Sequence, residues 1–520
     1  TSAAGITGDE LRNLYPDLYV QAYYEFAKQY NEDALTFFRA GGAGAGQHPV
    51  AWTGDQNSTF SAYRDAMRAT MTASMSGVPF TTWDLAGFSG EIPSTELYKR
   101  SVAQAAFSPI MQLHSEWGGD PNPSVARTPW NMYERTGDID CINIYRKFAN
   151  YRMSLIPYLY NNAKYTSDTG VPMMRSMAYE FPGDATAAQM EFQYMLGDSL
   201  LVAPIENEGQ TSKLIYLPEG EWIDLFWGSR RPGNQLITYY AGLDSLPVFV
   251  KAGSVIPMNL NADYEFGGSV GNSTSSYINE TYRIYPKDFT QYQYYDYVNE
   301  QQEQILVDER YDQSKVTITL PASGSVTSLQ VFTSEPTSVQ EGYSTMQRYT
   351  DFAQFKQAAS GWYYDSQQHL TYVRVQSNQA GTRSITLNGV QEVPYEAEFA
   401  ELTQTSVNTN HTGYQGTGFV DNFASVGTEV TFDVYAPEAG TYSLGIRYSA
   451  GTEAATRSVY VNDSRVAKVS LPKTTNWDTW STATTNVTLT AGKNTIIISY
   501  DTDDSAGINL DNISLHKSGG

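Results

Sequence analysis

Two aspartates and a histidine recur at regular intervals near the start of the sequence, each close to an aromatic residue. Asp55 ends a Trp-Thr-Gly-Asp motif, Asp84 lies in a Trp-Asp-Leu-Ala-Gly-Phe motif, and His114 opens a His-Ser-Glu-Trp motif. Carboxylates serve the cleavage of glycosidic bonds as acid, base or nucleophile. Aromatic faces stack on the apolar side of a sugar ring. Together, the three side chains indicate sugar chemistry.

Each of these side chains follows a segment with the pattern of a short strand. Buried strands are predicted over residues 35–39, 78–83 and 107–113, and a helix over 60–76, where apolar residues recur at helical spacing. A reactive group just after a strand and before a helix is typical of an α/β barrel. A single aspartate at a strand end is more often a helix N-cap. Three polar side chains in register favour a site.

The composition narrows the classes of function. The 520 residues are enough for three or four domains, and the formal net charge of −23 argues against nucleic acid, whose phosphates would be repelled. The single cysteine, Cys141, excludes a disulfide within the chain, as in a cytosolic protein or an exported bacterial one. No apolar run predicts a membrane span. Because the sequence opens with Thr-Ser-Ala-Ala, we interpret it as processed or truncated.

The fold class predicted from the sequence is α/β plus all-β. Strand-like and helical patterns alternate at first, with helices expected over 14–29 and 143–163, which predicts a parallel sheet and the last four or five units of an eight-fold barrel. Short strands broken by Gly, Pro and Asn follow, and a strongly alternating unit ends the chain. The predicted domains are a half-barrel over 1–195, a proximal β-sandwich over 196–262, a distal β-domain over 263–391 and a C-terminal β-sandwich over 392–520.

These motifs resemble a known family. The spacing of 16 residues from Arg39 to Asp55, 29 to Asp84 and 30 to His114 is similar to the second half of the catalytic barrel of glycoside hydrolase family 31. The resemblance covers residues 10–390 and implies a retaining enzyme acting on α-linked sugars. The segment from residue 107 to 138 is similar to the branch that handles cycloalternan and isomaltosyl α-glucans.

The resemblance implies a role for each residue of the motifs. Asp55 would be the general acid/base, which protonates the leaving glycosidic oxygen and then deprotonates the incoming water or sugar hydroxyl. Hydroxyls of the sugar in the −1 subsite would be held by Arg39, Asp84 and His114. Apolar walls that exclude water would be formed by Trp52, Trp83 and Phe88.

Several of these assignments have structural alternatives. Arg39 would serve equally in an ion pair with one of the aspartates, and His114 as a buried histidine satisfied by backbone. Glu116 and Trp117 are candidates for a plus subsite or for a structural role in their loop.

The second carboxylate that a retaining glycosidase needs is missing from the sequence. In the family it lies in a Trp-x-Asp motif on an earlier strand, and no such motif occurs in the residues before the first predicted helix. Asp9 and Glu10 enter a helix, and helix capping explains them better. We therefore expect the nucleophile before residue 1. The hypothesis is a C-terminal part of a longer enzyme that needs its N-terminal half as a partner.

The last domain resembles carbohydrate-binding module family 35, because Tyr-Glu-Ala-Glu at its start and Leu-Asp-Asn-Ile at its end match that family's sandwich. Glu396 and Glu398 share a face at strand spacing, and together with Asp511 they could bind one structural Ca²⁺. The alternative is a pair of solvated glutamates at an edge. Candidates for sugar contact, or for core packing, are Tyr414, Trp477, Trp480 and Asn512.

The sequence thus predicts a retaining α-glycosidase or α-glucosyltransferase for α-glucans or α-gluco-oligosaccharides, with hydrolysis and transfer both open. Expected partners are an α-linked oligosaccharide or polysaccharide and the N-terminal half, without nucleic acid, membrane span or catalytic cofactor. The alternatives are a non-catalytic α-glucan-binding protein, or the same enzyme class acting on α-galactosides or α-xylosides. An Asn-x-Ser/Thr site at Asn57 would obstruct the site if glycosylated, which favours a secreted bacterial protein.

Overall fold

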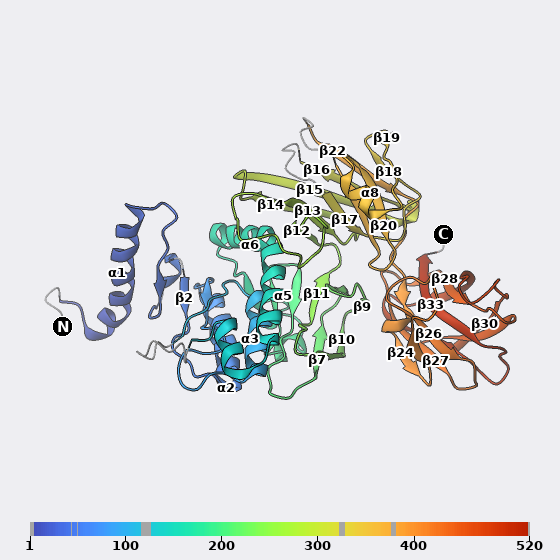
Figure 1. Ribbon diagram of the computed structural model, residues 1–520, viewed down its shortest axis with the longest axis horizontal. Coiled ribbons are helices and arrows are strands. Elements are labelled where there is room, and N and C mark those ends of the chain that lie inside the picture. The colour runs from blue at the N-terminus through green and yellow to red at the C-terminus, as the bar shows by residue number, and fades with distance from the viewer. Residues whose placement is uncertain are drawn as a thin grey trace.

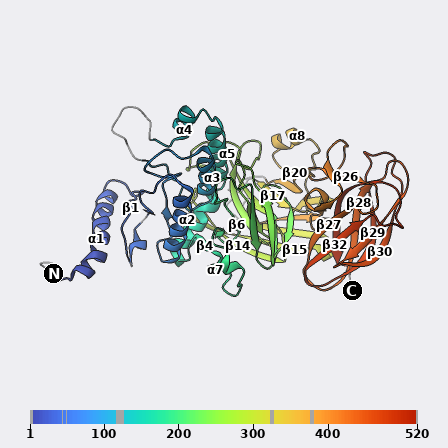
Figure 2. The same cartoon turned by 90° about the horizontal axis from the view of Figure 1, so that it is seen from below.

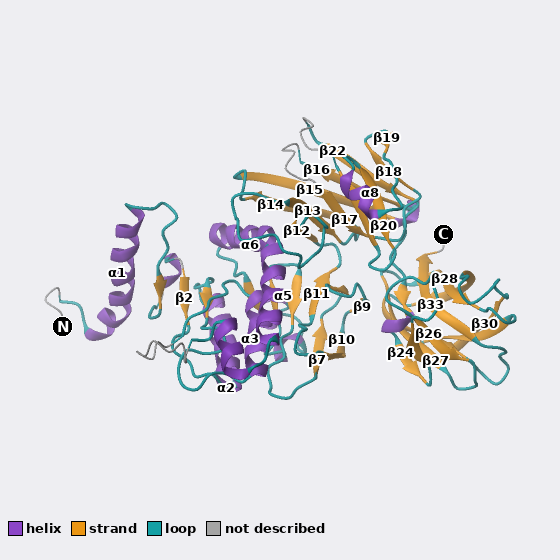
Figure 3. Cartoon of the chain, in the orientation of Figure 1, coloured by secondary structure: helices purple, strands orange, loops and turns teal. Residues whose placement is uncertain are grey.

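The computed structural model describes residues 5–42, 44–48, 50–115, 126–321, 328–375 and 381–517. Its regions are spread along the long axis, and the strands labelled β12 to β22 lie above β7 to β11 in this view (Figure 1). Helix α1 lies at one end, an α/β region comes next, two β-rich regions follow, and a last group of strands lies at the opposite end. Figure 3 shows that helices are concentrated in the N-terminal part and that strands dominate the rest.

A small parallel sheet carries the predicted site residues. Its order is β1-β2-β3, and a further parallel bridge joins Asp84 to Gln112 beyond β3. Helix α2 connects β2 to β3, and α3 follows β3, as a parallel sheet requires. The bounds are β1 (Phe37–Phe38), the 3₁₀ turn η1 (Ala45–Gln47), β2 (Val50–Trp52), α2 (Phe60–Met75), β3 (Thr81–Thr82) and α3 (Thr95–Ala106).

The strand predicted over 107–113 is reduced to that single bridge. Phe107 still caps the C-terminus of α3, so the segment begins as the end of a helix. Pro109 has no N–H to donate to a ladder and interrupts strand pairing. The chain nevertheless follows β3, because the Thr82 hydroxyl donates to the Ile110 carbonyl at 3.0 Å.

Helix α1 (Gly8–Lys28) begins in a capping box. The Thr7 hydroxyl accepts from the Glu10 N–H, and the Glu10 carboxylate accepts from the Thr7 N–H at 2.9 Å. The helical capping role expected for Glu10 is therefore confirmed, and Asp9 lies in the same first turn. Only Val20 of this helix is buried. Both views show α1 standing apart from the other helices (Figures 1 and 2).

Two helices replace the single one predicted over 143–163. α5 (Asp140–Ser154) ends at Leu155, and α6 (Ile156–Thr169) begins directly after it. Pro157 lies in the first turn of α6, where its missing N–H is tolerated, so the chain restarts a helix at that point. α4 (Pro129–Thr136) precedes both and packs against α5.

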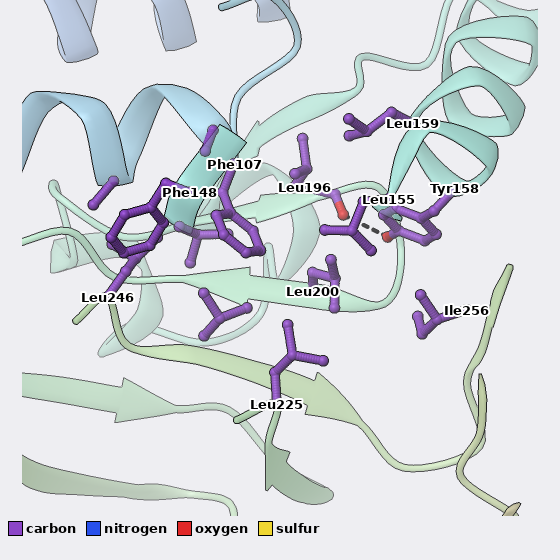
Figure 4. Close-up of a cluster of buried hydrophobic side chains, with 14 of the residues drawn as sticks. Phe107, Phe148, Leu155, Tyr158, Leu159, Leu196, Leu200, Leu225, Leu246 and Ile256 are labelled. Carbon is purple, nitrogen blue, oxygen red and sulfur yellow. Dashed lines mark hydrogen bonds between the residues drawn. The ribbon is translucent and has the colours of Figure 1, made fainter. Parts of the chain in front are cut away.

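The largest hydrophobic core joins this helical region to the strands that follow. Phe107, Phe148 and Leu155 are buried against Leu196 and Leu200 (Figure 4). The Tyr158 hydroxyl donates to the carbonyl of Leu196 at 2.6 Å, which satisfies the polar end of a fully buried ring. The core thus makes the α/β region and the first β-rich region one packed unit.

The first β-rich region contains a six-stranded sheet of order β4-β5-β6-β11-β8-β9 and the antiparallel pair β7 and β10. Its first two strands begin before residue 196, where the sequence analysis begins the proximal domain. The bounds are β4 (Met174–Ser176), α7 (Met177–Glu180), η2 (Ala187–Gln189), β5 (Tyr194–Leu196), β6 (Leu200–Val202), β7 (Ser212–Leu217), β8 (Glu221–Asp224), β9 (Arg230–Pro232), β10 (Gln235–Tyr240) and β11 (Val248–Lys251).

The second β-rich region contains two sheets that share a core of aliphatic and aromatic side chains. Their orders are β12-β13-β17-β21-β20 and β14-β15-β16-β22-β18-β19. The bounds are β12 (Val255–Leu260), β13 (Asn279–Ile284), β14 (Phe289–Asp296), β15 (Gln301–Arg310), η3 (Tyr311–Gln313), β16 (Lys315–Leu320), β17 (Ser328–Phe332), β18 (Ser338–Glu341), β19 (Ser344–Thr345), α8 (Phe352–Gln357), β20 (Gly361–Asp365), β21 (Leu370–Arg374) and β22 (Arg383–Asn388).

The last region has two antiparallel sheets around a core of its own. Their orders are β25-β26-β33-β28-β31, with β23 paired to β33, and β24-β27-β32-β29-β30. The bounds are β23 (Tyr395–Glu396), η4 (Ala397–Phe399), β24 (Glu401–Thr403), β25 (Ser406–Asn408), β26 (Phe419–Phe423), β27 (Glu429–Ala436), β28 (Gly440–Ser449), β29 (Ala455–Val461), β30 (Ser464–Leu471), β31 (Ser481–Leu489), β32 (Gly492–Ser499) and β33 (Ile508–Lys517). Within the described residues, no helix is long and apolar enough to cross a membrane.

Candidate functional site

The parallel sheet brings the predicted polar residues to one edge. Arg39 directly follows β1, Asp55 lies three residues after β2, and Asp84 lies two residues after β3. His114 follows the bridge residue Gln112. The carboxyl ends of parallel strands meet at the same edge of a sheet, and that edge is where barrel enzymes hold their reactive groups.

Arg39 and Asp55 form an ion pair at this edge. Nη1 of Arg39 lies 3.0 Å from Oδ2 of Asp55, and the two side chains keep 55% and 38% of their surface exposed. Gly54 has a φ of +94°, and a Cβ at this position would lie 2.6 Å from Nε of Arg39. Glycine thus allows both the turn and the close approach of the guanidinium. The pair leaves Asp55 open to an incoming ligand.

Asp84 is a buried carboxylate with two polar partners. Its Oδ1 accepts from Nε2 of Gln112 at 2.6 Å and lies 3.3 Å from Nδ1 of His114. Its Oδ2 has no hydrogen-bond partner among the described residues. Burial raises the pKa of Asp84 to about 6, against the opposing effects of His114 and Gln112. An unpaired buried acceptor beside a histidine can receive a hydroxyl donor.

Two of the three predicted aromatic residues surround the histidine. The ring centroid of Phe88 lies 4.9 Å from that of His114, and the ring of Trp52 meets His114 edge-on at 6.2 Å. The imidazole is 52% exposed, so it is neither buried nor satisfied by packing alone. These rings flank the histidine that contacts Asp84.

Trp83 lies elsewhere, which corrects the wall role expected for it. Its side chain is buried between α2 and α3, packs on Tyr63 at 5.3 Å and donates from Nε1 to Gln104 at 3.1 Å. Successive side chains of a strand point to opposite faces, so Trp83 and Asp84 cannot both face the ligand. Trp83 instead fixes the sheet against its covering helices.

Three supporting residues escaped the sequence analysis. Gln112 bonds the Asp84 carboxylate, and its position two residues before His114, on the same face of an extended segment, was a usable signal. Gln56 donates to the Asp84 carbonyl at 3.2 Å. Arg127, almost fully buried, donates to the Ser58 hydroxyl at 2.9 Å. Glu116 and Trp117 lie outside the described residues.

A second group of buried carboxylates lies in the C-terminal region. Glu396 ends β23 and Glu398 lies in the 3₁₀ turn after it, rather than on one strand face as expected. A Cβ on Gly416 would lie 2.4 Å from Oε1 of Glu398 and 3.0 Å from Cδ of Glu396, so both carboxylates border one small gap. Neither Oε2 atom has a hydrogen-bond partner among the described residues.

Burial disfavours the charged forms of both glutamates at this gap. Burial, reinforced by the Glu396 charge, raises the pKa of Glu398 to about 8, and the pKa of Glu396 is raised to about 8 by burial. Buried, unpaired carboxylate oxygens are the ligands that Ca²⁺ takes. The two glutamates therefore fit a cation, which excludes the solvated-edge alternative for them.

Asp511, the third predicted ligand, is fully buried on β33. Its Oδ2 is paired with Arg447, and its Oδ1 accepts from the Gln415 N–H at 3.1 Å. Nδ2 of Asn512 donates to Asp511 at 3.1 Å and contacts Glu396 at 3.5 Å. Asn512 therefore contacts the acidic group rather than standing free for a sugar.

A different acidic group, which the sequence analysis did not single out, lies at the β32–β33 turn. One carboxylate oxygen from each of Asp501, Asp503 and Asp504 lies within 4.8 Å of the others. Arg465 pairs with Asp503 at 2.8 Å, and Lys468 contacts Asp503 and Asp504. Basic side chains of the chain already neutralise this group.

The other candidates for sugar contact form a half-exposed cluster. Trp480 packs on Phe419 at 5.4 Å and donates to the Thr412 carbonyl at 2.8 Å. Tyr414 packs on the same phenylalanine at 5.6 Å. Trp477 lies 6.3 Å from His411. Each ring packs against a neighbouring side chain and is also partly exposed. Sugar contact and core packing therefore both remain open for these residues.

Models of known protein families match three parts of this chain. The profile of the glycosyl hydrolases family 31 TIM-barrel domain matches residues 1–162, and that of the family 31 C-terminal domain matches residues 170–256. The profile of carbohydrate binding module family 35 matches residues 393–517.

Whole proteins similar to the chain are about twice as long. An isomaltosyltransferase of Sporosarcina globispora is 50% identical over 99% of this chain, which covers 47% of that protein. A 1,6-alpha-glucosyltransferase of the same organism is 32% identical over 95% of the chain, which covers 41% of it.

Solved structures agree. A cycloalternan-forming enzyme from Listeria monocytogenes, in complex with a pentasaccharide substrate, is 47% identical with a TM-score of 0.97, over 99% of this chain and 49% of that one. Another structure of a Listeria monocytogenes protein with the same identity and TM-score contains glucose, magnesium and calcium. The chain therefore consists of a TIM-barrel fragment and C-terminal domain that belong to glycoside hydrolase family 31, followed by β-rich structure and a carbohydrate-binding module of family 35.

Proposed function

We propose that the protein carrying this chain is a retaining α-glycosidase or α-glucosyltransferase that acts on α-glucans or α-gluco-oligosaccharides. The observation that carries the proposal is the edge where Asp55, Arg39, Asp84 and His114 converge. The relatives named as isomaltosyltransferase and cycloalternan-forming enzyme support an isomaltosyl or cycloalternan type of substrate.

Asp55 is the general acid/base of this proposal. Its carboxyl protonates the glycosidic oxygen as the bond to the leaving sugar breaks, and its carboxylate then takes a proton from the incoming water or sugar hydroxyl. Its exposure allows the leaving group to reach it, and Arg39 holds it in place at 3.0 Å. Hydrolysis and transfer differ only in which hydroxyl gives up that proton.

Asp84 and His114 bind hydroxyls of the sugar whose bond is cleaved. The buried, unpaired Oδ2 of Asp84 accepts a hydroxyl hydrogen, and a charge-assisted hydrogen bond of this kind is strong. The rings of Trp52 and Phe88 exclude solvent on either side of the imidazole. This arrangement orients the sugar ring toward Asp55.

We place the nucleophile and the remaining barrel strands in an N-terminal half of the same enzyme, and the chain in the second half of the barrel with two β-domains after it. The support is an uncovered face: β1 lies at the edge of the sheet, and α1 exposes a row of apolar side chains. That row consists of Leu14, Tyr15, Leu18, Tyr19, Tyr23 and Phe26. Such a face in a barrel is covered by neighbouring helices and strands.

We further propose that the C-terminal module holds a structural Ca²⁺ between Glu396 and Glu398, with Asp511 beside them. The ion would neutralise buried carboxylates and tie η4 to the loop at Gly416. A polymeric glucan substrate and a carbohydrate-binding module suit a secreted bacterial protein.

The test is the Asp55→Asn substitution in the whole protein that carries this chain. Turnover of a natural α-glucan should fall by about 10²–10⁴-fold, because its leaving oxygen needs a proton. An aryl α-glucoside with an acidic phenol leaving group should lose much less in the first step. Asp65→Asn, on the exposed face of α2, is the matched control and should leave both rates unchanged. Unchanged glucan turnover in Asp55→Asn, or glucan binding without any turnover in the native protein, would support the non-catalytic alternative.

A further inference from the structure

A large open cavity lies away from the sheet edge of the candidate active site. It measures 710 Å³ and is bordered by α5, the β8–β9 turn, the β10–β11 loop, the loop after β12, α8 and β20. None of its lining residues precedes Lys147, so no residue of the candidate active site contributes to it. Its volume is in the range of sites that bind organic ligands of about 300–1,000 Å³.

One wall of the cavity is a cluster of aromatic rings. Tyr151 lies 4.8 Å from Phe266 and 5.1 Å from Phe226 between ring centroids. Beside them, Trp227 keeps 55% of its surface exposed, although it follows a buried strand. Exposed aromatic faces around a cavity provide flat apolar surfaces on which a ligand ring can stack.

The loop after β12 is held in an unusual conformation. Tyr264 has a φ of +58°, a region that aromatic residues rarely adopt. The Asn261 carboxamide oxygen fixes this turn by accepting from the Glu265 N–H at 2.9 Å. Tyr264 is only 2% exposed and lines the cavity, yet its hydroxyl has no hydrogen-bond partner among the described residues. Strain and an unsatisfied buried donor are features of binding sites rather than of plain packing.

The charges around the cavity nearly balance, because its lining holds three basic residues (Lys147, Arg283 and Lys356) and four acidic ones (Asp244, Asp263, Glu265 and Asp365). Lys147 binds Asp244 at 3.0 Å, and Lys356 binds Asp263. Asp365 accepts from Nε2 of Gln368 at 2.9 Å. A strongly charged ligand therefore finds no large excess of opposite charge, and a purely apolar ligand would displace water from these polar groups without offering them new hydrogen bonds. A neutral, polyhydroxylated ligand with apolar ring faces fits both kinds of lining.

We propose that this cavity is a second carbohydrate-binding site, separate from the candidate active site and from the C-terminal module. Its ligand is a short neutral α-gluco-oligosaccharide that stacks on Trp227 and bonds through its hydroxyls to the Asp365–Gln368 side. The choice of α-linked glucose rests on the proposed function. The site would hold a glucan chain on the face of the enzyme between the barrel fragment and the β-rich regions.

The experiment is hydroxyl-radical footprinting of the native protein with isomaltotriose as the probe. Trp227 should be protected in a saturable manner, while Tyr240, an exposed tyrosine on β10 outside the cavity lining, should not change. Protection of Trp52 and Phe88 in the same samples reports on the candidate active site. Protection there without protection of Trp227 would overturn the second site alone, and no protection at either place would count against the proposed function as well.

Substitution provides an independent measurement. Binding of isomaltotriose is measured by calorimetry in an Asp55→Asn background, which prevents turnover. The affinity of the proposed second site should weaken at least about tenfold in Trp227→Ala, as expected for truncation of a stacking tryptophan. Gln368→Ala, which removes another exposed side chain of the cavity lining, should weaken it as well. Tyr240→Ala should bind like its parent. Equal binding curves for all three variants would refute the site.

Discussion

The imidazole of His114 lies against the buried carboxylate of Asp84, with Nδ1 3.3 Å from Oδ1. One partner is half exposed and the other is completely buried, so a ligand can reach the pair only from the side of the histidine. Nε2 of Gln112 donates to the same Oδ1 of Asp84 at 2.6 Å. This arrangement presents a desolvated acceptor to the solvent-facing side of the sheet and leads to the first two predictions.

The burial of Asp84 should contribute less stability to the folded state at neutral pH than below pH 4. Its pKa is raised from 3.8 to about 6 on folding, so the folded state binds more protons than the unfolded state between these values. Stability contributed by this group is therefore present below the unfolded pKa and is lost as the pH rises to about 6. Asp84→Asn should recover up to about 3 kcal/mol of unfolding free energy at pH 7 and little at pH 3.5.

Calorimetric unfolding at both pH values measures this difference. Asp65→Asn, a substitution at an exposed position, controls for the general change in charge. The same Asp84→Asn protein should lose affinity for isomaltotriose, because its side chain no longer offers an ionised acceptor. Equal stabilisation at both pH values would contradict the assignment of the effect to ionisation.

Gln112 should act as a positioning residue for Asp84. The hydrogen bond that Gln112 donates to Oδ1 favours the charged form of Asp84. Gln112→Met keeps the side-chain length but removes this donor. We expect kcat/KM for an α-glucan to fall about tenfold, as for one lost hydrogen bond to a charged group. The acid limb of the pH–rate profile should move to higher pH. A fall in rate with an unmoved pH profile would mean that Gln112 serves packing alone.

Arg39 should matter for turnover but not for stability. Its ion pair with Asp55 is largely exposed, and such pairs contribute about 0–1 kcal/mol. Arg39→Ala should therefore leave the unfolding transition almost unchanged while lowering kcat/KM by about 10²-fold, because a sugar hydroxyl and the acid/base both lose their positioning group. Lys164→Ala, which breaks the exposed Lys164–Asp168 pair on α6, should change neither quantity. A parallel loss of stability and activity in Arg39→Ala would favour the structural alternative.

Removal of Ca²⁺ should destabilise the C-terminal module. Chelation with EDTA should lower its Tm, and Ca²⁺ at about 1,000 times its Kd should restore about 4 kcal/mol. Glu398→Gln should abolish this response because it removes one of the unpaired oxygens. Asp503→Asn should keep the response, since that carboxylate is neutralised by Arg465. The reverse pattern would place the ion in the Asp501–Asp504 group instead.

The sequence predicted which polar residues lie at the edge of the parallel sheet better than it predicted the packing around them. Arg39, Asp55 and Asp84 could be placed at strand ends because strand and helix patterns are local and repeat every two or about 3.6 residues. Asp9 and Glu10 indicated a helix start in the same local way, although the helix was predicted only from residue 14. The division of the predicted long helix at Leu155 depended on where Pro157 fell within the first turn.

Contacts between distant segments decided the rest. Alternation shows that Trp83 and Asp84 point to opposite faces, but only the packing of Tyr63 and Gln104 shows that the tryptophan faces the helices and the aspartate the ligand. The partner of Asp84, Gln112, comes from 28 residues away.

By itself, the sequence determined the order of the elements, the residues at the strand ends and the family resemblance, because these depend on local periodicity and motif spacing. Only the tertiary structure decided which faces are buried and which loops meet around Trp227. The burial of Asp84, which raises its pKa, is one such outcome. Burial and cavities arise where segments far apart in the chain pack together. A local sequence pattern does not show which distant segments come into contact.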